Sequence, residues 1–206
     1  MHLLVNGGLV DLLDLSPDDI HTVPLARALA RITRFAGNFN SISVAQHAVI
    51  VSNVVEHFDG TLTEQLAALH HDDSEAIMGD VPYDIKEACP AFICIENGVL
   101  DVIDEKYCCK TRGPLVQKAD KIVGNSELAF HIEEDCNLPR MMAALVDTDS
   151  GQGFHISALT LVPWAQEEAF ARYLDRHDTL LRGLAKEADR VREMAKPPAR
   201  LGPVVN

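Results

Sequence analysis

The sequence contains few cysteines, and their spacing argues against the two structures that cysteines most often build. Five are present: Cys89, Cys94, Cys108, Cys109 and Cys136. An odd number does not suggest a framework of disulfides, and no pair has the Cys-x-x-Cys spacing of a cysteine zinc site. We therefore expect reduced thiols and an intracellular protein.

Basic residues are scarce relative to acidic ones. The chain has 18 Lys and Arg against 31 Asp and Glu, so its formal net charge is -13. Broad contact with DNA or RNA requires many cationic side chains to displace counterions from phosphates, which argues against a nucleic-acid polymer as partner. A phosphorylated small molecule remains compatible, because a few cations or a bound metal ion can dominate the field inside one pocket.

Long apolar runs are absent as well. No stretch reaches the roughly 18 residues that a transmembrane helix needs. The first residues, MHLLVNGGLVDLLDLSPDD, have no basic segment, and Asn6, Gly7 and Gly8 interrupt their apolar run, which is not typical of a signal peptide. We expect a cytoplasmic protein without membrane contact. The sequence also lacks a βαβ alternation and a phosphate-binding glycine loop, which argues against Rossmann and P-loop nucleotide sites.

What the chain does contain is a series of apolar residues at helical spacing. The pattern predicts a short extended segment over residues 3–20, pairing as a small hairpin, and then helices at 22–35, 44–58, 62–78, 90–107, 114–135 and 163–195. We expect one domain over 1–195, with core helices over about 22–135, the C-terminal helix at its end, and a flexible tail at 196–206.

Several of these helices have recognisable start signals. Ser43 with Gln46, and Thr61 with Glu64, have the spacing of capping boxes. Thr22 is a candidate cap for the first helix. Within the helix at 90–107, Gly98 is expected to be a weak point.

Five consecutive polar residues, His71-Asp72-Asp73-Ser74-Glu75, follow apolar turns of the predicted helix at 62–78. Two interpretations are open. Burying such groups costs several kcal/mol for each unpaired charge, so a divalent cation is a natural compensator. Alternatively, the pentad is the solvated end of a surface helix.

Two further polar residues lie among apolar neighbours on other predicted helices. His47 is flanked by Ala48 and Val51, and Asp120 follows Ala119. A lone histidine on an apolar helix is more often a hydrogen-bonded core residue than a ligand. The combined order, however, is His, then His-Asp, then Asp, with each group on a separate predicted helix.

That order resembles the HD superfamily of metal-dependent phosphohydrolases. Four segments resemble its members related to the 5'-deoxynucleotidases: NGGLVDLLDLSPDDI, LARALARITRFAGNFNSISVAQHAVIVS, LAALHHDDSEAIMGDVPYDIK and QKADKIVGNSELAF. The resemblance extends over most of residues 3–180. It implies an all-α fold, an HD-domain bundle of roughly six to nine helices with the short extended N-terminal segment.

The resemblance also implies roles for individual residues. It makes His47, His71, Asp72 and Asp120 the metal ligands. Glu75 is then the catalytic carboxylate, acting with Asp72. The implied substrate contacts are Arg34 and Lys86 at the phosphate, with Phe35 and Asp80 at the sugar. One divalent transition ion, Co, Mn or Zn, fits this mixed nitrogen and oxygen set, with Mg as a further ion at the phosphates.

Two departures from the family pattern leave the ligand set partly open. His70 replaces an apolar residue, and Asp73 adds a carboxylate, so His70 with Asp73 or Ser74 is an alternative on the neighbouring helix face. We keep His71, because only His71 precedes Asp72 at the family spacing to Glu75. The remaining histidines have no partner at a telling spacing and are read as structural or exposed: His2, His21, His57, His131, His155 and His177.

The resemblance implies hydrolysis of a phosphate ester of a 2'-deoxynucleotide. Two reactions remain open: removal of a 5'-monophosphate, and release of triphosphate as in the related phage dATP triphosphohydrolases. Cations along the phosphate channel would discriminate them, and the candidates are Arg34, Lys86, Lys118 and Lys121. A non-catalytic nucleotide sensor and a purely structural helical oligomer are the alternatives. A homo-oligomer is expected, with the C-terminal helix as its surface through Leu174, Leu181, Leu184 and Val191.

Overall fold

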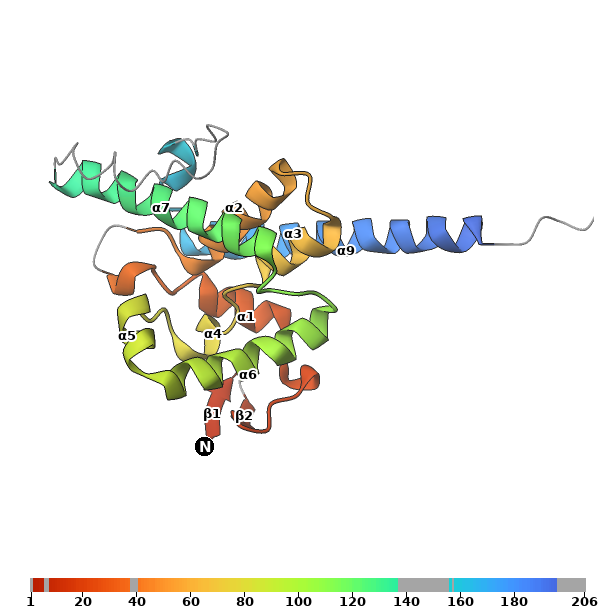
Figure 1. The fold of residues 1–206 in the computed structure, drawn as a ribbon, viewed down its shortest axis with the longest axis horizontal. Helices are drawn as coiled ribbons and strands as arrows, with labels where there is room; N and C mark the ends of the chain where they lie inside the picture. The colour runs from red at the N-terminus through yellow and green to blue at the C-terminus, as the bar shows by residue number, and fades with distance from the viewer. Residues whose placement is uncertain (1, 6–7, 38–40, 137–155, 157, 196–206) are drawn as a thin grey trace, which may run out of the picture.

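The structure is a computed structural model that describes residues 2–5, 8–37, 41–136, 156 and 158–195 (Figure 1). It confirms the all-α fold. The helices in chain order are α1 (Thr22–Leu29), α2 (Val44–His57), α3 (Leu62–Leu69), α4 (Glu75–Met78), α5 (Tyr83–Ala88), α6 (Pro90–Tyr107), α7 (Pro114–Cys136) and α9 (Gln166–Met194). Three short 3-10 helices cover Pro17–Asp19, Phe35–Gly37 and Ala158–Leu161. The predicted tail at 196–206 lies outside the described residues.

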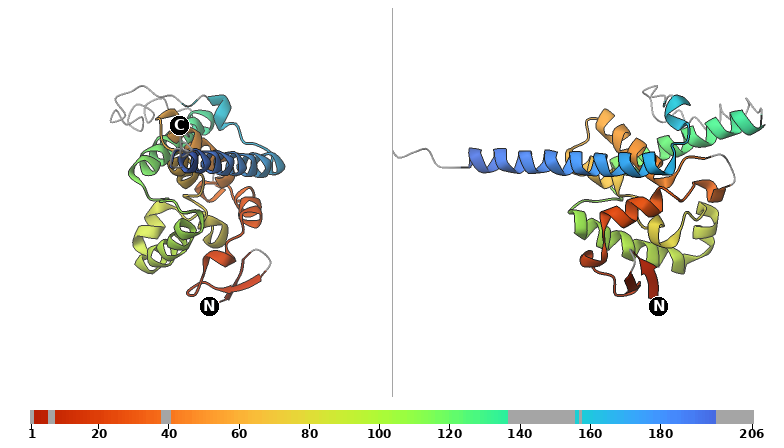
Figure 2. Two further views of the ribbon diagram at one scale, coloured as in Figure 1. Left: turned by 90° about the vertical axis from the view of Figure 1, so that its right-hand side faces the viewer. Right: turned by 180° about the vertical axis from the view of Figure 1, so that it is seen from behind.

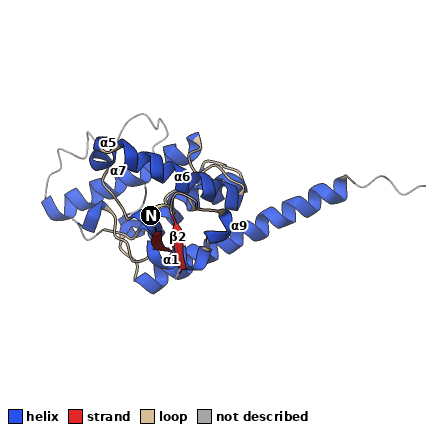
Figure 3. Cartoon of the chain, turned by 90° about the horizontal axis from the view of Figure 1, so that it is seen from below, coloured by secondary structure: helices blue, strands red, loops and turns tan. Residues whose placement is uncertain are grey.

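Two short strands form the predicted N-terminal hairpin. β1 (His2–Val5) pairs antiparallel with β2 (Gly8–Asp11), with His2 opposite Asp11 and Val5 opposite Gly8. The hairpin lies at one end of the molecule, beside α6 and away from α7 and α9 (Figure 1), and in the view from below it lies in front of the helices (Figure 3).

Helix α2 lies at the centre of the fold and is buried along most of its length. It packs against α3, α7 and α9 (Figure 2). Its many valines have modest helix propensity, but tertiary packing of apolar side chains stabilises helices more than propensity does. Because α2 is surrounded on several sides, a buried polar side chain on it must find its partner inside the protein.

The two predicted capping boxes differ in outcome. At α3 the box is complete: Glu64 N donates to Thr61 Oγ1 and Thr61 N donates to Glu64 Oε2. At α2, Ser43 Oγ accepts from Gln46 N, but the returning bond is missing, so that prediction was wrong in its second half. The buried Gln46 amide instead donates to the carbonyls of Thr160 and Val162 and ties that segment to α2.

The helix predicted at 22–35 was too long. α1 ends at Leu29, and the chain then becomes extended, with Thr33 bridged antiparallel to Ser43 and Arg34 N donating to the Ile42 carbonyl. Thr22 is not the cap, because the N-cap is His21 and Thr22 Oγ1 lies 2.9 Å from the Tyr107 hydroxyl. Arg34 is therefore carried by a short bridge rather than a helix.

The helix predicted at 62–78 is two helices. α3 ends at Leu69 and α4 begins at Glu75, and tight turns join them, with Asp73 N donating to the His70 carbonyl. The polar pentad consequently lies largely in a turn. Two smaller differences concern α6, which continues through Gly98 without a break, and α9, which begins at Gln166 rather than at Pro163.

Helix α9 is long, with 29 residues, and extends beyond the helices that it packs on. Its first half contacts α1, α2 and α3, and buries Ala169, Tyr173, His177 and Leu180. Its second half runs out beyond the other helices (Figure 1), and residues 185–195 are all exposed. Within the described residues, no helix combines the length and apolar character required to cross a membrane.

Candidate metal centre

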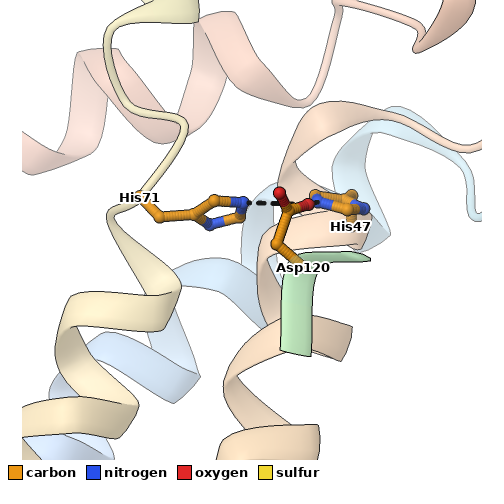
Figure 4. A group of neighbouring side chains, drawn as sticks. All are labelled: His47, His71 and Asp120. Carbon is orange, nitrogen blue, oxygen red and sulfur yellow. Dashed lines mark hydrogen bonds and ion pairs between the residues drawn. The ribbon is translucent and has the colours of Figure 1, made fainter. Parts of the chain in front are cut away.

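Three predicted ligands from three different elements meet at one point. His47 lies on α2, His71 in the turn after α3, and Asp120 on α7, and one possible ligand atom from each lies within 4.8 Å of the others (Figure 4). Asp120 Oδ1 is 3.0 Å from His47 Nε2 and 3.6 Å from His71 Nε2. This group could hold a metal ion.

The fourth predicted ligand lies beside this group. Asp72 Oδ2 is 3.2 Å from His71 Nε2 and 3.6 Å from His47 Nε2. The turn between α3 and α4 allows this, because consecutive residues on a regular helix point about 100° apart and do not face one point. His71 and Asp72 therefore reach the same centre because the predicted helix is broken there.

The hydrogen bonds of His71 direct its free nitrogen at the centre. Its Nδ1 lies 2.8 Å from the Ala68 carbonyl, which can only accept, so Nδ1 carries the proton and neutral His71 has its lone pair on Nε2. That Nε2 is buried and makes no hydrogen bond. An orphaned buried acceptor among carboxylates is a position that a cation satisfies.

His47 is oriented in the same way by a residue that the sequence analysis did not identify. His47 Nδ1 lies 2.7 Å from Glu127 Oε1, and both side chains are fully buried. Because the carboxylate accepts, the proton of a neutral His47 stays on Nδ1, and Nε2 is the nitrogen available to a metal ion. Glu127 is two helical turns after Asp120 on α7, and this spacing was the one sequence feature that could have indicated a role in the site. Many surface glutamates have the same spacing to an aspartate, so the feature is not specific.

Electrostatics at the centre favour a positive charge. Burial alone would lower the pKa of His71, but the carboxylates of Asp72 and Asp120 outweigh it and raise that pKa well above its usual value. The imidazoles of His47 and His71 hold the pKa of Asp120 well below its usual value against the effect of burial. The acceptors facing one another need a proton or a metal ion between them, and the set fits a divalent cation.

Arg34 lies at the edge of this centre. Its Nη1 donates to Asp72 Oδ2 over 3.2 Å, and its Nε donates to Glu127 Oε2 over 2.8 Å. The charges of Glu127 and Asp72 outweigh burial and raise the pKa of Arg34 further above its usual value. A permanent cation is thus fixed beside the ligand group.

Glu75 is buried at the first turn of α4, and its Oε2 makes no hydrogen bond. Burial and the neighbouring Asp72 charge raise the pKa of Glu75 to about 9. At neutral pH this side chain is therefore a carboxylic acid with a proton to give. Lys86 Nζ is 3.9 Å from Glu75 Oε1 and 2.7 Å from Glu96 Oε1, so Glu96 holds Lys86 beside Glu75.

Asp80 contacts the turn that follows Arg34 and contains Phe35. Asp80 Oδ2 accepts from Ala36 N over 3.1 Å, and the Arg34 guanidinium lies 5.7 Å from the Phe35 ring centre. Phe35 and Ala36 both have positive φ, of 58° and 51°, a backbone conformation that is uncommon outside glycine and clusters at functional sites. Lys118 instead lies over the Phe58 ring, 4.6 Å from its centre.

His70 and Asp73 form a separate buried network. His70 Nδ1 donates to Asp73 Oδ2 over 2.6 Å, and His70 Nε2 is 2.9 Å from His177 Nδ1 on α9. The Tyr173 hydroxyl donates to Asp73 Oδ1, and the His70 ring stacks on Tyr107. Neither side chain belongs to the group formed by His47, His71 and Asp120, so the structure brings His71, and not His70, into that group.

This network predicts a pH dependence of stability. Burial, together with the neighbouring His70, lowers the pKa of His177 to about 4. An unfolded histidine titrates near 6.5, so between these values the unfolded chain binds more protons. The contribution of His177 is complete above pH 6.5 and is lost as the pH falls toward 4, by about 2 kcal/mol after allowing for solvent screening.

We expect His177→Gln to flatten this dependence, because the amide has no proton to gain. The measurement is urea unfolding of both proteins between pH 4 and 7, in the presence of a chelator. A stability difference between the two proteins that stays constant over this range would contradict the prediction.

Comparisons with known proteins found two relatives and no matching family model. The chain is 38% identical over 95 residues to the protein of Escherichia coli strain K12 named "Uncharacterized protein YfdR", covering 45% of this chain. It is 33% identical over 90 residues to "Uncharacterized protein RCAP_rcc00048" of Rhodobacter capsulatus, covering 41% of this chain. The chain spans about half the length of these curated relatives, 50% and 46%.

Proposed function

We propose that this chain is an HD-type, metal-dependent phosphohydrolase that cleaves phosphate from 2'-deoxynucleotides. One observation carries the proposal. The orphaned Nε2 of His71 faces the Asp72 and Asp120 carboxylates beside the fixed cation of Arg34. A structural core rarely leaves a buried nitrogen without a hydrogen bond, whereas a phosphoryl-transfer site brings ligands for a metal and a cation for the phosphate together.

His47, His71, Asp72 and Asp120 are the residues that would hold the ion, which we expect to be Co, Mn or Zn. Such an ion, when bound, lowers the pKa of a coordinated water and polarises a phosphoryl oxygen. Arg34 would neutralise charge that grows on the phosphate, through its planar fork of donors. Glu75, as a buried acid, would give its proton to the leaving oxygen.

The sugar end of the substrate is proposed to lie at the turn after Arg34. Phe35 supplies a ring and Asp80 a carboxylate there, and the carboxylate can accept from a sugar hydroxyl. Lys86 lies between Glu75 and Glu96, where two acidic groups partly offset its charge. Among the described residues, Arg34 is the arginine that contacts Asp72, which favours attack on a monophosphate over a triphosphate, since a triphosphate carries more charge.

The test is incubation of metal-stripped protein with Co, Mn or Zn and a panel of ribo- and deoxynucleoside mono-, di- and triphosphates. Chromatography identifies released nucleoside, phosphate and triphosphate, with Asp72→Ala as the inactive control. We expect metal-dependent release of phosphate from deoxynucleoside monophosphates that Asp72→Ala abolishes. Tight binding of metal and nucleotide without turnover would instead support a non-catalytic nucleotide sensor. A protein that binds no divalent ion would support a purely structural role.

A further inference from the structure

Glu127 occupies an unusual position for a carboxylate. It is fully buried on α7, where a lone carboxylate would be costly. Each of its oxygens has one partner: Oε1 is bonded to His47 Nδ1 and Oε2 to Arg34 Nε. The two partners belong to different parts of the proposed site, one holding the metal and the other facing the phosphate.

The bond to His47 settles which ring nitrogen can ligate. Because a carboxylate only accepts, Nδ1 must keep its proton, so Nε2 is the nitrogen that can ligate once a metal ion replaces the proton between it and Asp120. Among the described contacts, Glu127 is the partner that fixes the proton on Nδ1 of His47. The other ring nitrogen, Nε2, faces Asp120. In His71 the Ala68 carbonyl accepts from Nδ1 and fixes the proton there in the same way.

The bond to Arg34 fixes a long side chain along α7. The guanidinium passes over Gly124, where a Cβ atom would lie 3.9 Å from Arg34 Nη2. Asp120, Gly124 and Glu127 follow one another at helical spacing on one face of α7. The same helix face thus supplies a metal ligand, room for the arginine, and the carboxylate that holds it.

We propose that Glu127 is a positioning residue that orients both His47 toward the metal and Arg34 toward the phosphate. The inference rests on the proposed function, because it assumes that the group around His71 holds a metal. With this role, the Glu127 carboxylate affects the affinity for the metal ion and the affinity for the phosphate, although it contacts neither of them.

The test uses three variants: Glu127→Gln, Arg34→Gln and the double variant. A glutamine has one acceptor oxygen, so it cannot serve both donors. We expect Glu127→Gln to weaken Co2+ binding by roughly 10- to 100-fold, as loss of an outer hydrogen bond to a ligand histidine typically does, and to change the visible absorption of bound Co2+. Arg34→Gln should keep or raise Co2+ affinity, because it removes a nearby positive charge, while raising the KM for nucleotide.

The double variant separates positioning from charge balance. If Glu127 orients His47, the double variant keeps the weak Co2+ binding of Glu127→Gln. If Glu127 only neutralises Arg34, removing the arginine restores Co2+ affinity, and the proposal is overturned. The double variant has no unpaired buried cation, so it also serves if Glu127→Gln alone does not fold. Gln117→Ala, exposed on the same helix, is the control.

Two further outcomes distinguish this inference from the proposed function. Wild-type protein that binds no Co2+ overturns the proposed metal centre itself. Wild-type protein that binds Co2+ and hydrolyses nucleotide, with Glu127→Gln binding Co2+ equally well, overturns only the role of Glu127.

Discussion

Replacing His71 with alanine should abolish metal binding and lower kcat/KM by at least about three powers of ten. The substitution removes one nitrogen ligand, and a bound ion contributes several kcal/mol to the reaction, at 1.36 kcal/mol for each factor of ten. The fold should survive, because His71 lies in a turn and its only described hydrogen bond is to the Ala68 carbonyl.

The measurement combines metal content by elemental analysis with steady-state kinetics on the nucleotide found active in the panel. His57→Ala is the matched control, since His57 is an exposed histidine at the end of α2. Circular dichroism should confirm that both variants are folded. Wild-type metal content and wild-type kcat/KM in His71→Ala would contradict the assignment of His71 as a ligand.

The second large effect is expected at Glu75. Glu75→Gln keeps the shape of the side chain but removes its acidic proton, so we expect kcat to fall by roughly 10²- to 10⁴-fold. Metal affinity should be nearly unchanged, because Glu75 is not in the ligand group formed by His47, His71 and Asp120. A lower kcat together with unchanged metal affinity would identify Glu75 as a catalytic acid and not as a metal ligand.

The pH profile gives a further readout for Glu75. A general acid must be protonated, and the pKa of Glu75 is raised to about 9. The rate should therefore hold at neutral pH and fall as the pH rises through about 9. Glu105→Gln, an exposed glutamate on α6, is the control. Glu75→Gln with wild-type kcat would show that this carboxyl does not transfer a proton.

The sequence predicted the helical content and two of the site's elements, the helices that carry His47 and Asp120, for clear physical reasons. Apolar residues at helical spacing determine which faces are buried, and local signals such as Thr61 with Glu64 determine where a helix begins. His47 and Asp120 were predicted on helices that the structure contains. These features depend on neighbours within a few residues, so a sequence pattern can reveal them.

The break between α3 and α4 depends on distant residues instead. The segment LTEQLAALHHDDSEAIM contains neither proline nor glycine, and local propensity favours one helix. In the folded chain, Tyr173 and His177 on α9 bind Asp73 and His70, and Arg34 binds Asp72. The turn is therefore accompanied by contacts far along the chain, which a local pattern does not contain.

Glu127 was missed for a related reason. A glutamate on a helix of mixed composition is usually solvated, and its burial follows only once His47 and Arg34 pack on the same face of α7. Arg34 itself was expected at the end of a helix. The bridge between Thr33 and Ser43 places it on an extended segment instead, and pairing across the chain overrides helix propensity there.

The contact between α9 and the ligand-bearing turn has a consequence for how the protein is made. The ribosome synthesises the chain from its N-terminus to its C-terminus, and contacts between distant segments form after local ones. Asp73 and His70 obtain their partners Tyr173 and His177 only when α9 has emerged. His71 and Asp72 lie between those two residues, so in a nascent chain that lacks α9 the turn that carries them lacks its contacts with Tyr173 and His177. The protein should thus acquire its metal ion after synthesis is finished.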